Sequence, residues 1–205
     1  MVVGSRSREK LASAARALGG RVETVAVDIG RDADVERSFA EVREVDHVVV
    51  TAVDPAYQPI RQLDLEAARR VIDSKLVGAL LVAKHARFRE GGSLTLTAGI
   101  ASERPGPNGS VVAAVNGALG ALARALSLEL APIRVNVVSP GWVDTPVWDS
   151  IAGGAKNDVF AKMAARLPVG RVGRPEDIAH AIVFLMESGF STGSVLHVDG
   201  GHRLV

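Results

Sequence analysis

The sequence has no cysteine among its 205 residues, few aromatic side chains (4%) and a net charge of only +1. Without cysteine there is no disulfide framework, no thiol nucleophile and no thiolate metal site. The near-neutral charge gives no reason to expect a nucleic acid or an anionic membrane as a partner. No uninterrupted apolar run reaches the roughly 18 residues of a membrane span, and the N-terminus becomes polar at Ser5, which argues against a signal peptide. These absences favour a cytoplasmic protein.

Several catalytic signatures are missing as well. The five histidines form no H-x-x-x-H or paired-carboxylate pattern, so we expect no metal site. No G-x-S-x-G elbow of a hydrolase occurs. The basic groups Arg69-Arg70 and Arg87-Phe88-Arg89 are better explained as solvated helix faces than as RNA contacts.

Aliphatic residues, by contrast, are abundant. Hydrophobic residues make up 47% of the chain, so residues 1–205 can form one domain whose core is built from Ala, Val and Leu. Arginine outnumbers lysine, and together with the many Ala, Gly and Val residues this hints at a GC-rich bacterial genome.

Short apolar segments alternate with amphipathic ones along the chain. We expect strands at 2–4, 22–27, 47–52, 93–97, 133–138 and 194–198, and helices at 8–18, 33–43, 65–88, 111–130, 158–166 and 175–186. Asp32 is the expected cap of the second helix, and Gly19-Gly20 and Gly91-Gly92 are expected to end helical units. This alternation predicts a doubly wound, Rossmann-type, mostly parallel sheet in a three-layer α/β/α arrangement.

The stretch from Val111 to Pro146 combines the clearest scaffold with a candidate site. Its helix, Val111 to Leu130, carries few charges and is expected to be buried nearly all round. The strand from Ile133 to Val138 is β-branched, as in a parallel strand covered on both faces. Ser139-Pro140-Gly141 is expected to stop this strand at its carboxyl end, where open α/β sheets bind ligands.

Four segments together resemble the short-chain dehydrogenase/reductase family: VVVTA at 48–52, VNVVSPGWVDTP at 135–146, GRPEDIAHAIVFL at 173–185 and TGSVLHVDGG at 192–201. The resemblance spans essentially the whole chain. It implies a Rossmann-type fold, hydride transfer between a nicotinamide cofactor and a small carbonyl or alcohol, and a homodimer or homotetramer assembled through the Val111–Leu130 helix and the last strand.

The resemblance also locates the positions that carry catalysis in the family, and all of them are changed here. The positions of the family's Tyr and Lys are occupied by Val112 and Asn116, and those of its Ser and Asn by Ala98 and Lys75. The only tyrosine, Tyr57, lies in a different loop. Lys75 is either a relocated acid or a structural lysine that reaches out to solvent.

Cofactor-binding positions are better preserved. Arg6, with Ser5, follows the first strand where an acidic residue would bind an NAD ribose, so arginine favours the 2′-phosphate of NADP(H); the alternative is a solvated arginine at a helix start. By resemblance, Asp28 and Ile29 flank the adenine, although an aspartate at a strand end is common in any case. Ala52, which ends the VVVTA segment, is also among the cofactor-binding positions by resemblance. Pro140, Gly141, Val143 and Thr145 resemble the nicotinamide-side loop, although Pro140-Gly141 also suits a plain tight turn.

The family's first strand and its glycine-rich phosphate loop have no counterpart in this sequence, which resembles a divergent, N-terminally truncated member. Leaving two interior strand edges unpaired would cost on the order of 10–30 kcal/mol if their backbone groups were buried. Three outcomes are open: a start upstream of Met1, a Met1–Gly4 strand moved beside His47–Ala52, or a strand from a partner chain. We expect the first for the gene and the second for a compact structure of this chain.

Two functions follow. The first is an NADP(H)-linked oxidoreductase of this family, with a relocated proton donor. The second is a non-catalytic relative that serves as a binding or assembly subunit, with no cofactor in this chain. By resemblance, the segment from Trp148 to Pro168 would determine which substrate binds; here it is polar and interrupted by glycine.

Overall fold

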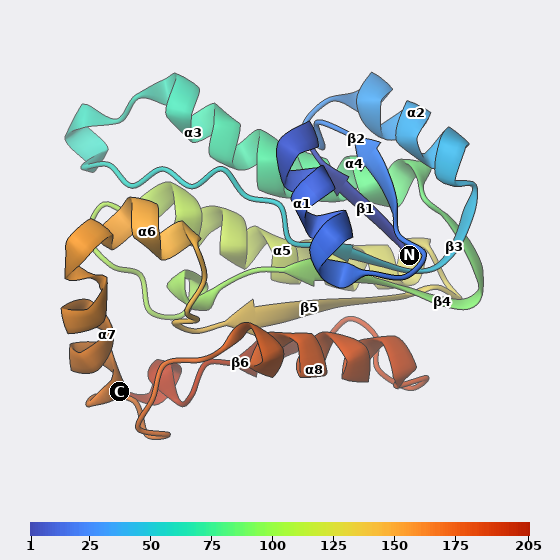
Figure 1. The fold of residues 1–205 in the computed structure, drawn as a ribbon. Coiled ribbons are helices and arrows are strands. Elements are labelled where there is room, and N and C mark those ends of the chain that lie inside the picture. Colours follow the sequence, from blue (N-terminus) through green and yellow to red (C-terminus); the bar gives the residue numbers. More distant parts are fainter.

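The computed structural model describes residues 1–205, except for the side chains of 150 and 151. The strands are β1 (Val2–Ser5), β2 (Glu23–Ala26), β3 (Glu44–Val50), β4 (Arg87–Thr97), β5 (Arg134–Pro140) and β6 (Val195–Val198). The helices are α1 (Arg8–Leu18), α2 (Asp32–Val42), α3 (Leu65–Ile72), α4 (Gly78–His85), α5 (Ser110–Glu129), α6 (Val147–Ala152), α7 (Lys156–Ala164) and α8 (Pro175–Glu187). Helices α3, α4 and α5 lie on one face of the main sheet and α8 on the other (Figure 1). The expected Rossmann-like α/β fold with parallel strands is confirmed.

The strands form two sheets instead of one. Strand β1 pairs in parallel with β2, and β3, β4, β5 and β6 form a second parallel sheet in that order. No ladder joins β1 to β3, so each has one edge without a neighbouring strand. The expectation that Met1–Gly4 would move beside His47–Ala52 and close the sheet is therefore wrong.

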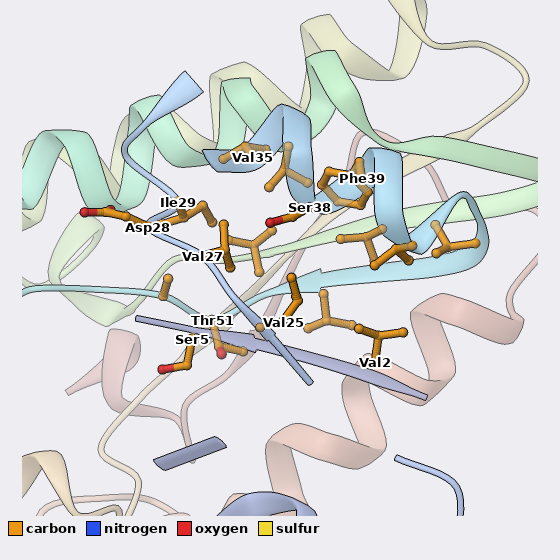
Figure 2. Close-up of a pocket in the computed structure, with 18 of the residues that line it drawn as sticks. Val2, Ser5, Val25, Val27, Asp28, Ile29, Val35, Ser38, Phe39 and Thr51 are labelled. Carbon is orange, nitrogen blue, oxygen red and sulfur yellow. The ribbon is translucent and has the colours of Figure 1, made fainter. Parts of the chain in front are cut away.

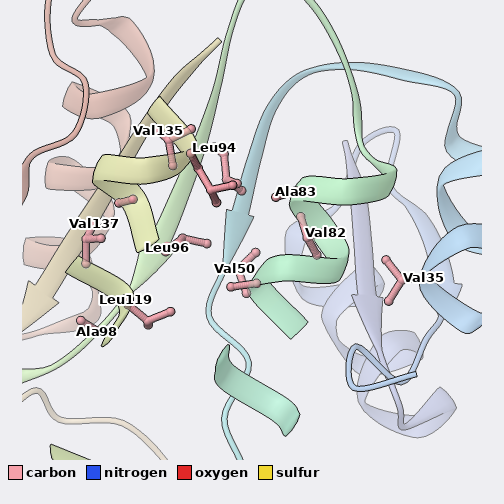
Figure 3. Close-up of a cluster of buried hydrophobic side chains, with 13 residues drawn as sticks. Val35, Val50, Val82, Ala83, Leu94, Leu96, Ala98, Leu119, Val135 and Val137 are labelled. Carbon is pink, nitrogen blue, oxygen red and sulfur yellow. The ribbon is translucent and has the colours of Figure 1, made fainter. Parts of the chain in front are cut away.

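The main core lies between the four-stranded sheet and the helices on one of its faces. Leu94 and Leu96 from β4, Val135 and Val137 from β5, and Leu119 from α5 are almost inaccessible to solvent. Val82 and Ala83 of α4 and Val35 of α2 extend this cluster toward the smaller sheet (Figure 3). Aliphatic side chains thus supply the core, as the composition predicted.

Helix α5 follows its predicted range closely but is not buried all round. Val112, Val115, Asn116, Leu119, Ala123 and Leu126 face the interior, whereas Ala114, Gly117, Ala121 and Leu128 are exposed. By length and composition alone α5 resembles a membrane span, but its buried face packs against β5 in the core. Apart from Arg124 and Glu129, the exposed face is apolar and built largely from small residues.

The segment predicted as one helix over 65–88 is three pieces. Helix α3 passes into a π-helical turn at Asp73–Val77 and then into α4, which ends at His85. Gly91 and Gly92 lie within β4 instead of ending a unit, next to a register shift between Val45 and His47 of β3. A Cβ on Gly92 would lie 2.8 Å from the carbonyl oxygens of Arg89 and Asp46, so glycine permits this bulge.

Two smaller predictions are corrected at element ends. Asp32 does not cap α2, because Arg31 occupies that position without a side-chain cap; the Asp32 carboxylate instead binds Lys84 and His85. Strand β5 continues through Ser139 and Pro140, which pair with His197 and Val198 of β6. The turn therefore begins at Gly141.

Candidate functional site at the carboxyl ends of the strands

The predicted adenosine-side residues lie together. Ser5, Arg6, Asp28, Ile29 and Ala52 all line one cavity of about 780 Å³ between the two sheets (Figure 2). They come from three segments: the end of β1, the loop after β2 and the loop after β3. The sequence comparison with the family therefore selects residues that share one cavity.

Arg6 is held in place across this cavity. Its guanidinium lies 3.4 Å from the carboxylate of Asp54, in the loop that follows β3. The Arg6 side chain is 57% exposed, so it remains accessible to an anionic ligand. Ser5 turns inward at the same point, where its Oγ accepts a hydrogen bond from the Ser7 amide. Asp54 is a residue that the sequence reasoning missed, and its position directly after an apolar strand was the available signal.

Asp28 and Ile29 have structural roles at the end of β2. The Asp28 carboxylate accepts a hydrogen bond from the Gly30 amide at 3.0 Å, which fixes the turn before α2. Ile29 packs onto Gly78 at the start of α4, where a Cβ would lie 2.9 Å from the Ile29 side chain. Both residues line the same cavity as Arg6.

Lys75 does not reach out to solvent. It lies in the π-helical turn, is 8% exposed, and its Nζ donates a hydrogen bond to the Ala98 carbonyl at 3.1 Å. Burial lowers the pKa of this ammonium to about 8, because the charged form loses water without gaining a carboxylate partner. π-Helical turns often accompany functional sites. The buried amine of Lys75 can therefore exchange a proton near neutral pH.

The neighbouring family positions are apolar or uncharged. Val112 is 6% exposed and packs with Val71 and Val115. Asn116 lies against Gly99, and its Oδ1 has no partner among the described residues. The hydroxyls of Thr97 and Ser139, at the ends of β4 and β5, are also buried and have no partner in the described part of the chain. Polar atoms are therefore available here, although the acid–base pair of the family is not.

Tyr57 lies near the start of α5, although the sequence places it in a separate loop. Its ring lies within 3.8 Å of the point that a Cβ on Gly109 would occupy, and Gln58 donates a backbone hydrogen bond to Asn108. Burial raises the pKa of the Tyr57 phenol. The loop carrying Tyr57 therefore forms one wall next to the Val112 cluster, in which Ala56 takes part.

The Pro140–Thr145 loop lies apart from the cavity lined by Arg6. A Cβ on Gly141 would lie 2.7 Å from the Cα of Asp199, so packing alone requires glycine. Val143 forms an isolated bridge with Gly173, and the Thr145 carbonyl accepts from the Trp148 amide. The loop is thus fixed by backbone contacts at the carboxyl end of β5.

Trp142 of this loop belongs to a cluster of three aromatic rings. Trp142 stacks on Trp148 with 4.3 Å between ring centroids, and Phe160 meets both rings edge-on. Lys156 lies over Phe160 and pairs with Asp144 and Asp149. The segment that was predicted to determine the choice of substrate therefore forms α6 and α7, next to the Pro140–Thr145 loop. Trp148 and Phe160 were the signal in the sequence for this packing, and the prediction did not use them.

No cluster of three or more His, Asp or Glu side chains suited to a metal occurs among the described residues. Taken together, a parallel α/β sheet with loops gathered at its carboxyl ends defines the open α/β class of proteins, whose members bind ligands at this edge.

Comparison with known proteins narrows this class. A family model described as enoyl-(acyl carrier protein) reductase matches residues 1–203. The chain is 34% identical to the cis-4-hydroxycyclohexanecarboxylate dehydrogenase of Sinomonas cyclohexanicum over all of its length and 87% of the relative's. It is 32% identical to human 3-oxoacyl-[acyl-carrier-protein] reductase, covering 88% of that protein.

Solved structures agree. A small-chain dehydrogenase in complex with NADPH aligns with a TM-score of 0.86 and 31% identity, covering 100% of this chain and 98% of that one. A short-chain dehydrogenase/reductase from Brucella melitensis aligns with a TM-score of 0.91 and 30% identity, covering 98% of this chain and 84% of that one. The chain belongs to the short-chain dehydrogenase/reductase family of oxidoreductases.

Proposed function

We propose that this protein binds NADP(H) and acts as an oxidoreductase on a small carbonyl or alcohol, with Lys75 replacing the family's phenol as proton donor. The observation that carries the proposal is the position of Arg6. Its guanidinium, oriented by Asp54, stands at the carboxyl end of β1 beside Asp28 and Ile29. Arginine pairs well with a phosphate because its donors match two oxygens at once.

The residues present fit the two ends of the dinucleotide. Ser5 and Arg6 would hold the 2′-phosphate, and Asp28, Ile29 and Ala52 would border the adenine. At the other end, the unpartnered hydroxyls of Thr97 and Ser139 and the amide oxygen of Asn116 would meet the nicotinamide side, next to the Pro140–Thr145 loop. These orphaned polar groups support a polar ligand here, because buried polar atoms normally have partners. When bound, the cofactor supplies or accepts the hydride.

Lys75 supplies the proton chemistry in this proposal. A general acid works best when its pKa is close to the working pH. The Lys75 ammonium, with a pKa lowered to about 8, meets that condition and is oriented by its hydrogen bond to Ala98. In a carbonyl reduction it would donate a proton to the oxygen, so turnover should fall as the pH rises above about 8.

A second candidate is a non-catalytic subunit that binds or assembles. The observation in its favour is the packing of Val112 against Val71 and Val115, which replaces a proton donor with a sealed apolar contact. In that case the family framework is retained for binding alone.

Nucleotide titration is the first test of the proposed oxidoreductase against the non-catalytic subunit. NADPH and NADH are added separately while the fluorescence of Trp142 and Trp148 and the heat of binding are recorded. We expect NADPH to bind more tightly than NADH, and Arg6→Ala to weaken NADPH by about tenfold or more, as for loss of one charge-assisted contact. Arg16→Ala, an exposed arginine on α1, is the control. No response to either nucleotide at millimolar concentration would contradict the proposal.

Catalysis is tested next. Reduced nicotinamide is followed by absorbance in the presence of a panel of ketones, aldehydes and acyl thioesters. Lys75→Met should abolish turnover and leave NADPH binding unchanged. Binding without turnover in the unsubstituted protein would favour the non-catalytic subunit.

The proposal includes a homodimer or homotetramer formed through the exposed face of α5, and a location in the cytoplasm. Support for the assembly comes from the apolar residues Ala114, Ala121 and Leu128 on that face. An exposed apolar stripe of this length is commonly covered by a partner.

A further inference from the structure

His202, in the turn that follows β6, is a buried histidine whose imidazole has no hydrogen-bond partner. The side chain is 8% exposed, and its Nδ1 is fully buried without a partner among the described residues. The His202 amide donates to the Asp199 carbonyl at 3.0 Å, which ties this residue to the end of β6. Because buried polar atoms normally have partners, the imidazole is available to a polar group from outside the chain.

Arg166 is held beside this imidazole by the segment that follows α7. A Cβ on Gly201 would lie 2.6 Å from the Pro168 side chain, and the Val169 amide donates to the Gly200 carbonyl at 3.3 Å. The end of α7 and the C-terminus lie next to each other for this reason (Figure 1). Arg166 directly precedes these contacts; it is exposed and has no ion pair within the described part of the chain.

Arg104 approaches the same imidazole from another segment, the loop between β4 and α5. Its amide donates to the Ile100 carbonyl at 2.8 Å, which closes the turn after β4. Besides burial, which is the largest cause, the charges of Arg104 and Arg166 lower the pKa of His202, and such charges act over short distances. Arg104 is also exposed and has no ion pair among the residues described. Two guanidinium groups therefore converge on one imidazole.

The positive charge of this group is not neutralised from within. Asp199 is the carboxylate that acts on His202, and it opposes the two arginines only in part. Its oxygens accept hydrogen bonds from the amides of Gly201 at 3.0 Å and Arg203 at 3.1 Å, inside a turn where the residue is buried. Asp199 is thus used by the backbone, and the arginines remain free to pair with an anion.

The group lies next to the part of the site assigned to the nicotinamide. A Cβ on Gly141 of the Pro140–Thr145 loop would touch the backbone of Asp199. On the other side, the loop that carries Arg104 begins at Ala98, whose carbonyl accepts the hydrogen bond from the proposed proton donor. A molecule that reaches outward from the site between these two loops would meet the arginines.

We propose that Arg104, Arg166 and His202 form an anion site, which binds a carboxylate or phosphate group of the substrate. The carbonyl or alcohol that reacts would then carry an acidic group at its far end. The assignment to the substrate rests on the proposed function, whereas the anion site does not. Each guanidinium can donate two parallel hydrogen bonds to an oxyanion, and an imidazole supplies a further N–H.

Inorganic phosphate is the first probe. The full chain without nucleotide is titrated with phosphate at constant ionic strength, since salt screens exposed charges. The ring signals of His202 are followed by NMR and assigned by their loss in His202→Gln. We expect a saturable shift and a raised pKa of the imidazole with phosphate bound, because the anion offsets the arginine charges. Ring signals that do not respond to phosphate would overturn the proposal.

Substitutions of the arginines locate the binding. Arg104→Gln and Arg166→Gln should each weaken phosphate about tenfold or more, as for the loss of one charge-assisted contact. Both residues are exposed, so the melting temperature should stay unchanged. Arg16→Gln and Arg6→Ala are the controls, and neither should alter the response of His202. Phosphate binding that survives both Arg104→Gln and Arg166→Gln would contradict the site.

Two pairs of ketones test whether the substrate supplies the anion. Dihydroxyacetone phosphate is compared with dihydroxyacetone, and levulinate with methyl levulinate, by displacement of phosphate and by oxidation of NADPH. We expect one charged ketone to displace phosphate and to have a kcat/KM about tenfold or more above that of its uncharged partner, with this preference lost in Arg166→Gln. The preferred pair shows whether the acidic group is a phosphate or a carboxylate.

The results distinguish the two proposals. Equal kcat/KM within both pairs would overturn the assignment of the anion site to the substrate. Phosphate binding without turnover of any of the four ketones would count against the proposed oxidoreductase and leave the anion site in place.

Discussion

The ammonium group of Lys75 lies 3.1 Å from the carbonyl oxygen of Ala98, in the interior of the protein. A π-helical turn on one side and the end of β4 on the other bring these two residues together. The contact leaves a buried positive charge with a neutral partner, which costs stability at neutral pH. This cost can be measured.

Substituting Lys75→Met should raise the free energy of unfolding by about 1–3 kcal/mol at neutral pH. This gain is the cost of burying the charged ammonium, which the lowered pKa reflects, minus the contribution of the hydrogen bond that methionine cannot make. The pKa is 10.5 in the unfolded chain and about 8 in the fold. Between these values the unfolded state binds more protons, so the stability of the unsubstituted protein rises with pH and the advantage of methionine shrinks. Urea unfolding at a series of pH values measures the difference in free energy of unfolding between the two proteins. Lys10→Met, an exposed control, should show no such trend; a pH-independent advantage for methionine at position 75 would be inconsistent with a buried ammonium.

Gly141→Ala should reduce the free energy of unfolding by about 1–3 kcal/mol, because its methyl group would overlap the backbone of Asp199. Thermal unfolding of this variant is compared with that of Gly154→Ala, where nothing lies within 4 Å of the added Cβ. If Gly141 were required only for a ligand, both variants would have the stability of the unsubstituted protein.

Ala121→Arg should shift the proposed oligomer toward monomer, since it places a charge in the middle of the exposed face of α5. Size-exclusion chromatography with light scattering gives the mass. Ala12→Arg, on the exposed face of α1, serves as the control. A mass unaffected by Ala121→Arg would exclude this face as the interface.

The stability of the protein should decline as the pH falls below 6.5, the ordinary pKa of a histidine, and His202 should account for part of this decline. Burial, followed by the charges of Arg104 and Arg166, lowers the pKa of this imidazole, and Asp199 opposes the shift only in part. The unfolded chain then binds more protons below 6.5, so this contribution is present above 6.5 and is lost as the pH decreases. Melting temperatures of the protein and of His202→Gln, measured between about pH 8 and pH 5, should converge on acidification. Substituting exposed His180 by Gln should leave the decline unchanged.

Local signals in the sequence were sufficient for most of the secondary structure. Helices α1, α5 and α8 lie within one residue of their predicted ranges, because apolar periodicity, Gly19 and Pro175 mark their limits. The break at Asp73–Val77 was not predictable, since a π-helical turn keeps the apolar pattern and changes only the hydrogen bonding. Gly91-Gly92 was misread because a glycine in a bulge and a glycine after a helix look alike in sequence.

The sequence grouped residues that the structure brings together, but it did not reveal their contacts. Ser5, Arg6, Asp28, Ile29 and Ala52 do line one cavity. The Lys75–Ala98 hydrogen bond depends on tertiary packing between residues far apart in the chain, as does the Arg6–Asp54 pair. The exposed side of α5 was missed for a related reason: an apolar helix face that is exposed and one that faces the core have the same composition.

The separation of β1–β2 from the main sheet also affects how the protein opens. No ladder of backbone hydrogen bonds joins residues 1–43 to the rest; side chains do, through Asp32 with Lys84 and His85, Ile29 on Gly78, and Arg6 with Asp54. The ion pairs among these contacts weaken with salt, whereas Ile29 on Gly78 and Val35 in the main core cluster are held by apolar packing. Raised salt should therefore loosen the first 43 residues before the remainder unfolds, and the joint around Arg43 is then the point where a protease would first cut.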